Sequence, residues 1–169
     1  MFELKYLSKE TIPAALEKAE RYRLLNEALE AESICLDILE IEPENQPVLV
    51  TLLLALTDQF EERLGEAVTR AREVLSRLRD EYSKVYYGGI ICERQAKAHL
   101  KRAGPGSGHM AYSYFREAME CYEKAAEIRP PGNDDPILRW NTCCRILMRN
   151  PNLAPEPEEG GELVLETLE

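Results

Sequence analysis

The chain has 169 residues, of which 44% are apolar and 31% are charged, a balance that is ordinary for a globular helical protein. Its 21 basic and 31 acidic residues give a net charge of -10 at pH 7. Because phosphate binding needs clustered positive charge, this composition disfavours nucleic acid as a partner. A chain of this length can bury roughly 70% of its unfolded surface, so we expect one domain.

The negative charge is concentrated near the C-terminal end. Six glutamates follow Pro151, where there is no Lys or Arg. They supply six of the ten net negative charges, which leaves -4 for the preceding residues. Because this segment is rich in Pro, Glu and Gly, we expect residues 151–169 to form an acidic flexible tail.

The sequence favours a cytoplasmic location without membrane association. Residues 1–10 lack the apolar stretch of a signal peptide, and the longest apolar run, residues 48–56, is far shorter than the roughly 20 residues that span a bilayer. The five cysteines show no CxxC spacing. We interpret Cys35, Cys92 and Cys121 as small buried hydrophobic residues in a reducing compartment.

One apolar helix face recurs three times along the chain. The copies are Ala28, Ala31, Cys35 and Ile38, then Leu64, Ala67, Ala71 and Val74, then Phe115, Ala118, Tyr122 and Ala125. The spacing of three, four and three residues is that of one side of an α-helix. Another helix-like stretch precedes each copy, so the pattern predicts a stacked helical repeat.

The first repeat, over about residues 12–45, carries a family resemblance. Residues 19–45, AERYRLLNEALEAESICLDILEIEPEN, resemble a tetratricopeptide repeat, a helix–turn–helix unit of about 34 residues. Ala19 and Ala31 match the small residues where helices touch, Tyr22 matches an aromatic position and Pro43 matches the closing proline. Cys35 replaces the usual aromatic residue of the second helix.

The second repeat, over about residues 46–81, contains an unusually apolar helix. Residues 48–57, VLVTLLLALT, have no polar side, so we expect this helix to be covered on several sides in the middle of the stack. A turn is expected at residues 60–64, and a helix follows to about Arg79. On its outer face Glu66–Arg70 and Glu73–Arg77 have the spacing of ion pairs. The arginines of this helix indicate a solvated face or, alternatively, an anion-binding patch.

The third repeat, over about residues 82–132, is longer than the others. A helix from Tyr82 to about Arg102 contains Gly88 and Gly89, each of which costs about 1 kcal/mol relative to alanine. Gly89 falls where the family keeps a small residue for close helix approach, whereas Gly88 has no such explanation. The loop at residues 104–108, GPGSG, precedes a helix expected to start near Met110, so we expect a long projecting hairpin.

A final helix is expected over residues 134–150. Asp135 is the expected cap and Pro136 the first helical residue, with Ile137, Trp140, Cys144 and Leu147 forming the buried stripe. By its resemblance, the chain is expected to be all-α: a right-handed superhelical tetratricopeptide-like array over residues 1–150, with three helix pairs and this C-terminal capping helix.

The sequence contains no recognisable catalytic constellation. His99 and His109 have no adjacent acid, and the glycine loop lacks the GxxxxGK[ST] pattern of a phosphate cradle. Cys143 and Cys144 could bind a metal or become oxidised; alternatively, one is buried and the other partly exposed. We therefore expect neither an enzyme nor a cofactor or metal site.

The family resemblance implies a binding groove on the concave side of the array, formed by the first helix of each repeat. Such grooves bind extended peptides or helices. The implied groove positions are Leu16, Glu20, Arg23, Val50, Leu54, Asp58, Tyr86, Ile90, Glu93, Arg94, Asn141 and Arg145. The Lys and Asn residues with which chaperone-binding members hold a peptide carboxylate are missing. The middle of the groove is apolar, which suits an amphipathic helix or an aliphatic peptide.

The sequence leaves open whether this groove is free. The last residues contain Leu163, Leu165 and Leu168 among acids, and we hypothesise that they dock on the groove of their own or a neighbouring chain. The expected function is a protein–protein interaction module. The alternative is a self-assembly unit that forms a homo-oligomer through the ends of the stack or through the tail.

Overall fold

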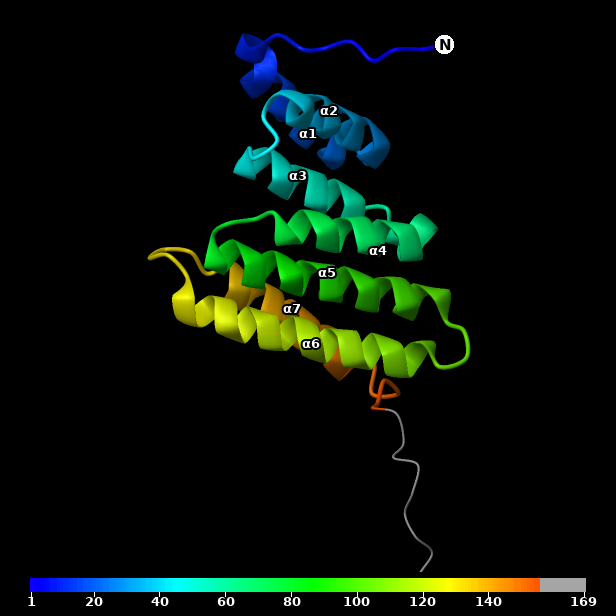
Figure 1. Ribbon diagram of the computed structural model, residues 1–169. Coiled ribbons are helices and arrows are strands. Elements are labelled where there is room, and N and C mark those ends of the chain that lie inside the picture. Colours follow the sequence, from blue (N-terminus) through cyan, green and yellow to red (C-terminus); the bar gives the residue numbers. More distant parts are fainter. Residues whose placement is uncertain (156–169) are drawn as a thin grey trace, which may run out of the picture.

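The computed structural model describes residues 1–155, which contain seven α-helices and no β-strand. The elements are η1 (Lys9–Thr11), α1 (Ile12–Leu24), α2 (Ala28–Ile41), α3 (Gln46–Thr57), α4 (Phe60–Ser76), α5 (Glu81–Arg102), α6 (Ser107–Ile128) and α7 (Asp135–Arg149). Helices α1 to α6 follow one another along the length of the molecule, and α7 lies behind α5 and α6 (Figure 1). The expected all-α class is therefore confirmed. Residues 156–169, the larger part of the expected tail, lie outside the described residues.

Local sequence signals explain where several helices begin. The Asn45 side chain caps α3 by accepting a hydrogen bond from the Val48 N–H at 3.2 Å, and Asp80 caps α5 by accepting one from the Ser83 N–H at 2.9 Å. Pro13 and Pro47 lie in the first turns of α1 and α3, where a missing N–H has no cost. Asn26, with a φ of 61°, makes the tight turn between α1 and α2.

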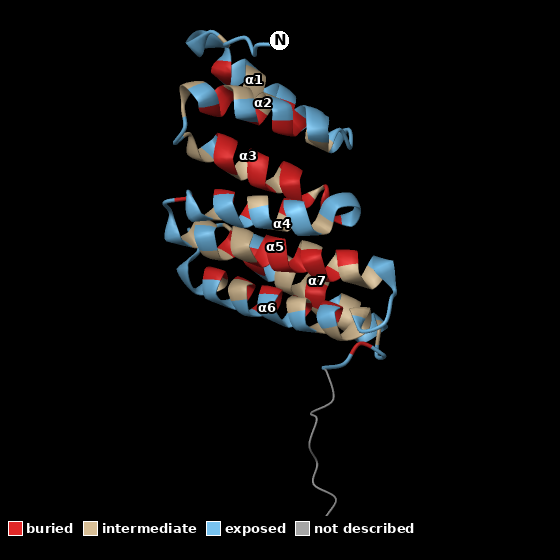
Figure 2. Ribbon diagram, turned by 45° about the vertical axis from the view of Figure 1, so that its right-hand side comes forward, coloured by how far each residue is buried: buried red, intermediate tan, exposed pale blue. Residues whose placement is uncertain are grey.

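Helix α3 lies at the centre of the N-terminal half, as its apolar composition predicts. It contacts α1, α2, α4 and α5, and eight of its residues are buried. Figure 2 shows it coloured as buried along most of its length. Burial of its leucines stabilises the fold by about 2 kcal/mol each, so α3 joins the helices on either side.

The core has two parts. Helices α1 to α4 enclose the first, which includes Ile38, Leu53 and Phe60. Helices α5 to α7 enclose the second, around Phe115 and Tyr122. Leu54 packs against both parts, so the two cores are continuous through α3.

Helices α5 and α6 are the longest, with 22 residues each, and they pack along each other. Their connected ends extend beyond the end of α3 (Figure 1). Gly89 allows this packing, because a Cβ there would lie 2.7 Å from Cε1 of Tyr122. A Cβ on Gly88 would meet only Leu75, at 3.6 Å. The interpretation of Gly89 as a site of close helix approach is confirmed.

Some local expectations are wrong. The turn expected at residues 60–64 is instead the start of α4, with non-helical dihedral angles at Arg63. Helix α6 begins at Ser107 rather than near Met110, because Gly106 adopts a φ of 76° and reverses the chain earlier. Leu153, placed in the flexible tail by its sequence, is buried against the second core.

The arginines of α4 do not form the expected pairs along their own helix. Arg70 pairs with Glu32 of α2, and Arg77 donates a hydrogen bond to the Pro43 carbonyl oxygen at 2.7 Å. These arginines contact residues distant in sequence because α4 packs between α3 and α5, which brings neighbouring elements within reach of their side chains. Arg70 and Arg77 therefore connect this part of the chain to α2 and to the segment that follows α2.

The buried side of α7 also differs from the expected stripe. Pro136 and Cys143 are its buried residues, whereas Ile137 is exposed. Asp134 occupies the position before the helix, and the Asn133 side chain accepts a hydrogen bond from the Asp135 N–H at 3.0 Å. Trp140, Cys144 and Leu147 of the expected stripe are partly buried and pack against the second core, so within the stripe the expectation is wrong only at Ile137. Among residues 1–155, no helix is both long enough and apolar enough to cross a membrane.

Candidate functional site

A groove lies between α1, α3 and α5, with a volume of about 620 Å³. Its lining consists of Glu20 and Arg23 of α1, Gln46, Pro47, Val50, Thr51 and Leu54 of α3, Leu78, Arg79 and Asp80 before α5, and Ser83 and Tyr87 of α5. We call this surface the central groove. Four of the positions implied by the resemblance line it: Glu20, Arg23, Val50 and Leu54.

The floor of the central groove is apolar. Pro47, Val50 and Leu54 lie three and four residues apart on one side of α3, and Tyr87 of α5 lies across from them. We call these four residues the apolar strip. The side chains of Val50, Leu54 and Tyr87 are only partly buried, so they present apolar surface to solvent. Such a strip suits the apolar side chains of a peptide or helix.

One end of the central groove carries an ion-pair network around Asp58. Asp58 Oδ2 accepts a hydrogen bond from Arg23 Nε at 2.8 Å, and its Oδ1 lies 3.5 Å from Arg94 Nη2. Arg94 Nε is buried and has no hydrogen-bond partner in the described part of the chain. Two guanidinium groups thus share one carboxylate, and one of them has an unused donor.

A second network adjoins the first on α5. Glu93 is completely buried and accepts hydrogen bonds from Tyr122 Oη at 2.6 Å, from Arg139 Nη1 at 3.2 Å and from Lys97 Nζ. Burial acts to raise the pKa of Glu93, but the bonds from Lys97 and Tyr122 and the charge of Arg139 outweigh it and lower that pKa. Burial raises the pKa of Tyr122, and the negative charge of Glu93 raises it further. Glu93 is therefore ionised at neutral pH.

The two networks together carry excess positive charge. Arg23 and Arg94 pair with Asp58, and Lys97 and Arg139 pair with Glu93, whereas the carboxylates of Glu20 and Asp80 line the central groove outside these networks. We call the six residues of the two networks the cationic cluster; its net charge is +2. Each of its four cationic side chains keeps between 20% and 35% of its surface exposed. The cluster can therefore accept a further carboxylate from solvent.

The structure corrects three of the implied groove positions. Tyr86, Ile90 and Glu93 are 8%, 2% and 0% exposed, and they pack toward α6 and α7 instead of lining an open surface. Gly89 explains this orientation, because its close contact with Tyr122 fixes which side of α5 faces α6. Residues three and four positions from Gly89 share that side.

Three further implied positions lie away from the central groove. Leu16 packs against the first core, and Asn141 and Arg145 lie on α7 as a partly buried and an exposed residue. Asp58 and Arg94 do not line the groove itself but belong to the network that includes Arg23. The twelve implied positions are thus divided between the groove, the cationic cluster, the core and α7.

Sequence reasoning missed Tyr87, Lys97 and Arg139. Tyr87 is one residue beyond Tyr86, and a shift of one residue turns a side chain by about 100° around a helix. The contact between Gly89 and Tyr122 could have identified the correct side of α5. Nothing in the sequence indicates that Arg139 of α7 would reach Glu93, because the two residues are 46 positions apart.

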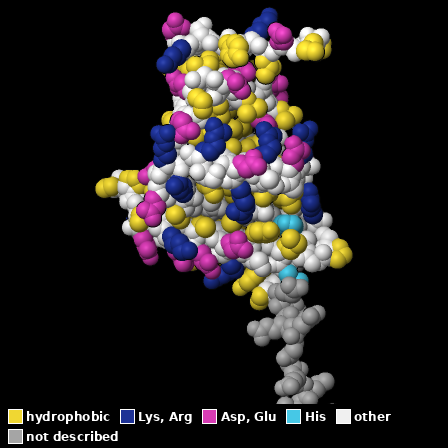
Figure 3. All heavy atoms as spheres, in the orientation of Figure 1, with side chains coloured by type: hydrophobic (Ala, Val, Ile, Leu, Met, Phe, Trp, Pro, Cys, Tyr) yellow, Lys and Arg dark blue, Asp and Glu magenta, His cyan; other side chains and the backbone are white. Residues whose placement is uncertain are grey.

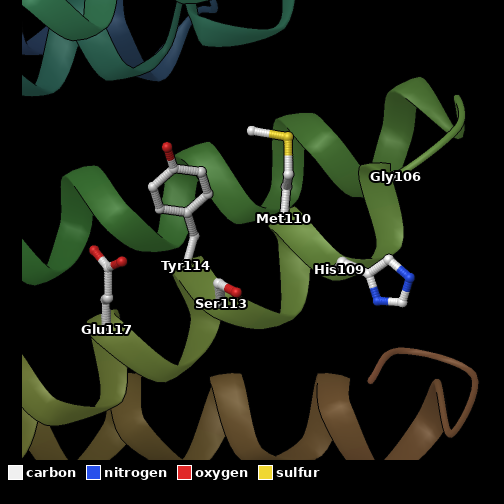
Figure 4. A pocket seen from close by; sticks show the side chains of 6 residues that line it. All are labelled: Gly106, His109, Met110, Ser113, Tyr114 and Glu117. Atoms are coloured by element: carbon white, nitrogen blue, oxygen red, sulfur yellow. The ribbon is translucent and has the colours of Figure 1, made fainter. Parts of the chain in front are cut away.

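A second hollow, of about 470 Å³, lies along α6. It is lined by Gly106, His109, Met110, Ser113, Tyr114 and Glu117, and Figure 4 shows Met110, Tyr114 and Glu117 projecting from the same side of this helix. His109 Nδ1 lies 2.9 Å from the Ala154 carbonyl oxygen, to which it donates. All six lining residues come from one helix and its start, so this hollow has no opposing wall of converging polar groups.

The face seen in Figure 3 shows basic and acidic side chains interspersed, without a large area of one sign. Apolar side chains of the N-terminal segment project beyond it, and Phe2, Leu4 and Tyr6 are almost fully exposed.

The cysteines are mostly buried, and one histidine stacks on an aromatic ring. Burial raises the pKa of the Cys35 and Cys143 thiols to about 12 and that of Cys92 to about 11. All five cysteines are unpaired, Cys143 is buried, and Cys144 is partly exposed. The ring of His99 stacks on Tyr114 at 5.5 Å. In the described residues no group of three or more His, Cys, Asp or Glu side chains could hold a metal ion.

The chain matches no protein-family model, no curated protein and no solved structure.

Proposed function

We propose that the chain is a cytoplasmic, tetratricopeptide-like interaction module, which binds an acidic, apolar peptide or helix in its central groove and catalyses no reaction. The observation that carries this proposal is the contact between two surfaces of different chemistry. The apolar strip ends beside the cationic cluster, since Leu54 is one helical turn before Asp58, and Arg23 of the cluster also lines the central groove.

The packing order supports the family assignment within this proposal. Helix α3 contacts α1 and α5 as well as the helices that precede and follow it, as expected when the first helices of successive pairs lie side by side. Small residues occur where the helices approach: Ala19, Ala31, Ala67 and Gly89 are all buried. Five unpaired cysteines favour a reducing compartment.

The chemistry of the groove defines the ligand. An aliphatic side chain placed on the apolar strip gains about 25 cal/mol for each Å² of apolar surface removed from water. A carboxylate beside Arg94 gains a charge-assisted hydrogen bond from its guanidinium group, since this side chain is 33% exposed. A peptide with aliphatic residues followed by an acid therefore fits better than a basic peptide.

Selection from a displayed library of random 12-residue peptides tests this function. We expect the full chain to enrich peptides that contain both aliphatic and acidic residues. The double variant Val50→Glu and Leu54→Glu should weaken their binding at least tenfold, because it places two carboxylates on the apolar strip. The matched control Leu25→Glu and Leu138→Glu adds the same charge at exposed leucines outside the groove.

The control variant should bind like the unmodified chain. If no peptide is enriched, or if both double variants bind equally well, the central groove is not a peptide-binding site.

A second candidate function, self-assembly, is favoured by exposed apolar residues at both ends of the molecule. Leu25 and Leu29 are 62% and 56% exposed near the start, and Leu138 and Met148 on α7 are 62% and 75% exposed. These residues suit end-to-end association of copies. Light scattering over a hundredfold range of concentration measures it: a constant monomer mass refutes self-assembly, and a mass that rises and is reduced by Leu138→Glu supports it.

A further inference from the structure

The cationic cluster is unusual in a chain that carries a net charge of -10. Its four cations face two carboxylates, and Arg94 retains a buried donor with no partner among residues 1–155. Because these four side chains remain 20–35% exposed and outnumber the carboxylates that they pair with, the cluster is chemically suited to an additional carboxylate.

The same chain contains a segment with the complementary charge. Residues 156–169, EPEEGGELVLETLE, hold six glutamates and no basic residue. They also hold Leu163, Val164, Leu165 and Leu168, which match the apolar strip. Aliphatic side chains flanked by acids are the ligand chemistry derived above for the central groove.

The described chain ends close to the relevant helix. Leu153 is buried against the second core, near Gly108, and the Ala154 carbonyl accepts the hydrogen bond from His109 at the start of α6. That start is joined to the end of α5 by residues 103–106. The segment therefore leaves the fold at the end of α5 that carries Lys97 and Lys101.

The segment is long enough to reach the groove. Its 14 residues can extend over about 46 Å. The distance along α5 from Lys101 to Tyr87 is about 21 Å at 1.5 Å per residue. More than half of the contour length is left for crossing the fold and for binding.

We propose that residues 156–169 occupy the central groove of their own molecule, with the leucines on the apolar strip and the glutamates at the cationic cluster. This inference rests on the proposed function, because it uses the same groove, and it names the ligand that fills the groove when no partner is bound. An external peptide then competes with the segment. With an effective concentration of about 1 mM and a segment affinity of about 0.1 mM, the segment weakens external binding about tenfold.

Photo-cross-linking in the full chain tests this occupancy. A benzophenone amino acid replaces Leu165, and an equal mixture of ¹⁴N-labelled and ¹⁵N-labelled chains is irradiated and mapped by mass spectrometry. We expect cross-links within one molecule to the region of Val50, Leu54 and Tyr87. The yield should fall at least threefold in about 0.5 M salt, where the screening length is close to 4 Å.

A variant that removes two positive charges from the cationic cluster, compared with a matched control, tests whether these charges hold the segment. Arg94→Gln with Lys97→Gln should reduce the yield at least threefold, while Lys84→Gln with Arg102→Gln removes the same charge from exposed positions of α5 and should leave it unchanged. Asp58 keeps Arg23, and Glu93 keeps Arg139 and Tyr122, so the first variant retains partners for both carboxylates. If the variant Arg94→Gln with Lys97→Gln fails to fold, the salt dependence of the cross-linking yield in the unmodified chain tests the charge effect instead.

Cross-links to other surfaces, cross-links only between chains, or a yield independent of charge and salt would each overturn the proposal. The library selection separates it from the proposed function. Library peptides that bind the groove without any cross-link of the segment refute the segment's role alone. The opposite result is also informative. If the segment cross-links to the groove, but the library yields no ligand even for a chain with Leu163→Glu, Leu165→Glu and Leu168→Glu, the external-partner function alone is refuted.

Discussion

Gly88 and Gly89 provide a sharp test of how α5 packs, because they are adjacent in one helix and differ in their surroundings. In both Gly88→Ala and Gly89→Ala, alanine gains about 1 kcal/mol of helix propensity. At position 88 the new Cβ meets only a Leu75 methyl group at the ordinary distance of 3.6 Å. We therefore expect Gly88→Ala to stabilise the fold by about 0.5–1 kcal/mol.

At position 89 the propensity gain is outweighed by a steric clash. The new Cβ lies 2.7 and 3.0 Å from two ring atoms of Tyr122 and 3.1 Å from the Cβ of Cys121. The Tyr122 ring is completely buried and its hydroxyl is bonded to Glu93, so it cannot move without breaking that bond. Overpacking costs up to about 3 kcal/mol, and contacts this short belong at the upper end, so after subtracting the propensity gain of about 1 kcal/mol we expect Gly89→Ala to destabilise the fold by about 2 kcal/mol.

Thermal unfolding followed by circular dichroism measures both effects. A difference of about 3 kcal/mol between the two variants corresponds to about 6–12 °C in Tm for a chain of this size. Equal Tm values, or a less stable Gly88→Ala, would refute the orientation assigned to α5 and with it the division between groove-facing and core-facing residues.

Three further predictions concern the charge network, the thiols and a helix cap. Glu93→Gln should destabilise the fold by about 2 kcal/mol at pH 7, measured by urea unfolding. The pKa of Glu93 in the folded chain lies below its ordinary value of 4.5, so the stability that its charge contributes is present above pH 4.5 and is lost as pH falls through the folded pKa. The variant should therefore lose less stability than the unmodified chain on acidification. Cys144 should react with a thiol reagent at pH 8 faster than the buried Cys143, and equal rates in the folded chain would contradict the orientation of α7. Asn45→Ala should cost about 1 kcal/mol through loss of the α3 cap, and no change in Tm would contradict the capping role.

The fold class could be predicted from the sequence because helix formation is encoded locally. The period of the apolar residues, the prolines in first turns and the polar residues before α3 and α5 act over a few positions, and the helices occur close to where these signals place them. The errors occur where several weak signals compete. Gly106 permitted an earlier start of α6 than the apolar pattern indicated.

The candidate site could be predicted only in part, because rotation of a helix about its axis depends on its neighbours. On α3, which is apolar almost all round, Val50 and Leu54 were placed correctly in the groove. On α5 the groove face was placed one residue away from Tyr87, although the role given to Gly89 already implied that Tyr86 and Glu93 face α6. The bond between Arg139 and Glu93 joins distant parts of the chain, and no local pattern encodes it.

The most direct test of the central claim is an NMR titration of the ¹⁵N-labelled full chain with a peptide from the library selection. The account predicts that amide shifts concentrate at Val50, Leu54, Tyr87, Asp58 and Arg94, which join the apolar strip to the cationic cluster. Shifts confined to the hollow on α6 or to the outer side of α7 would contradict it and would place the binding surface elsewhere.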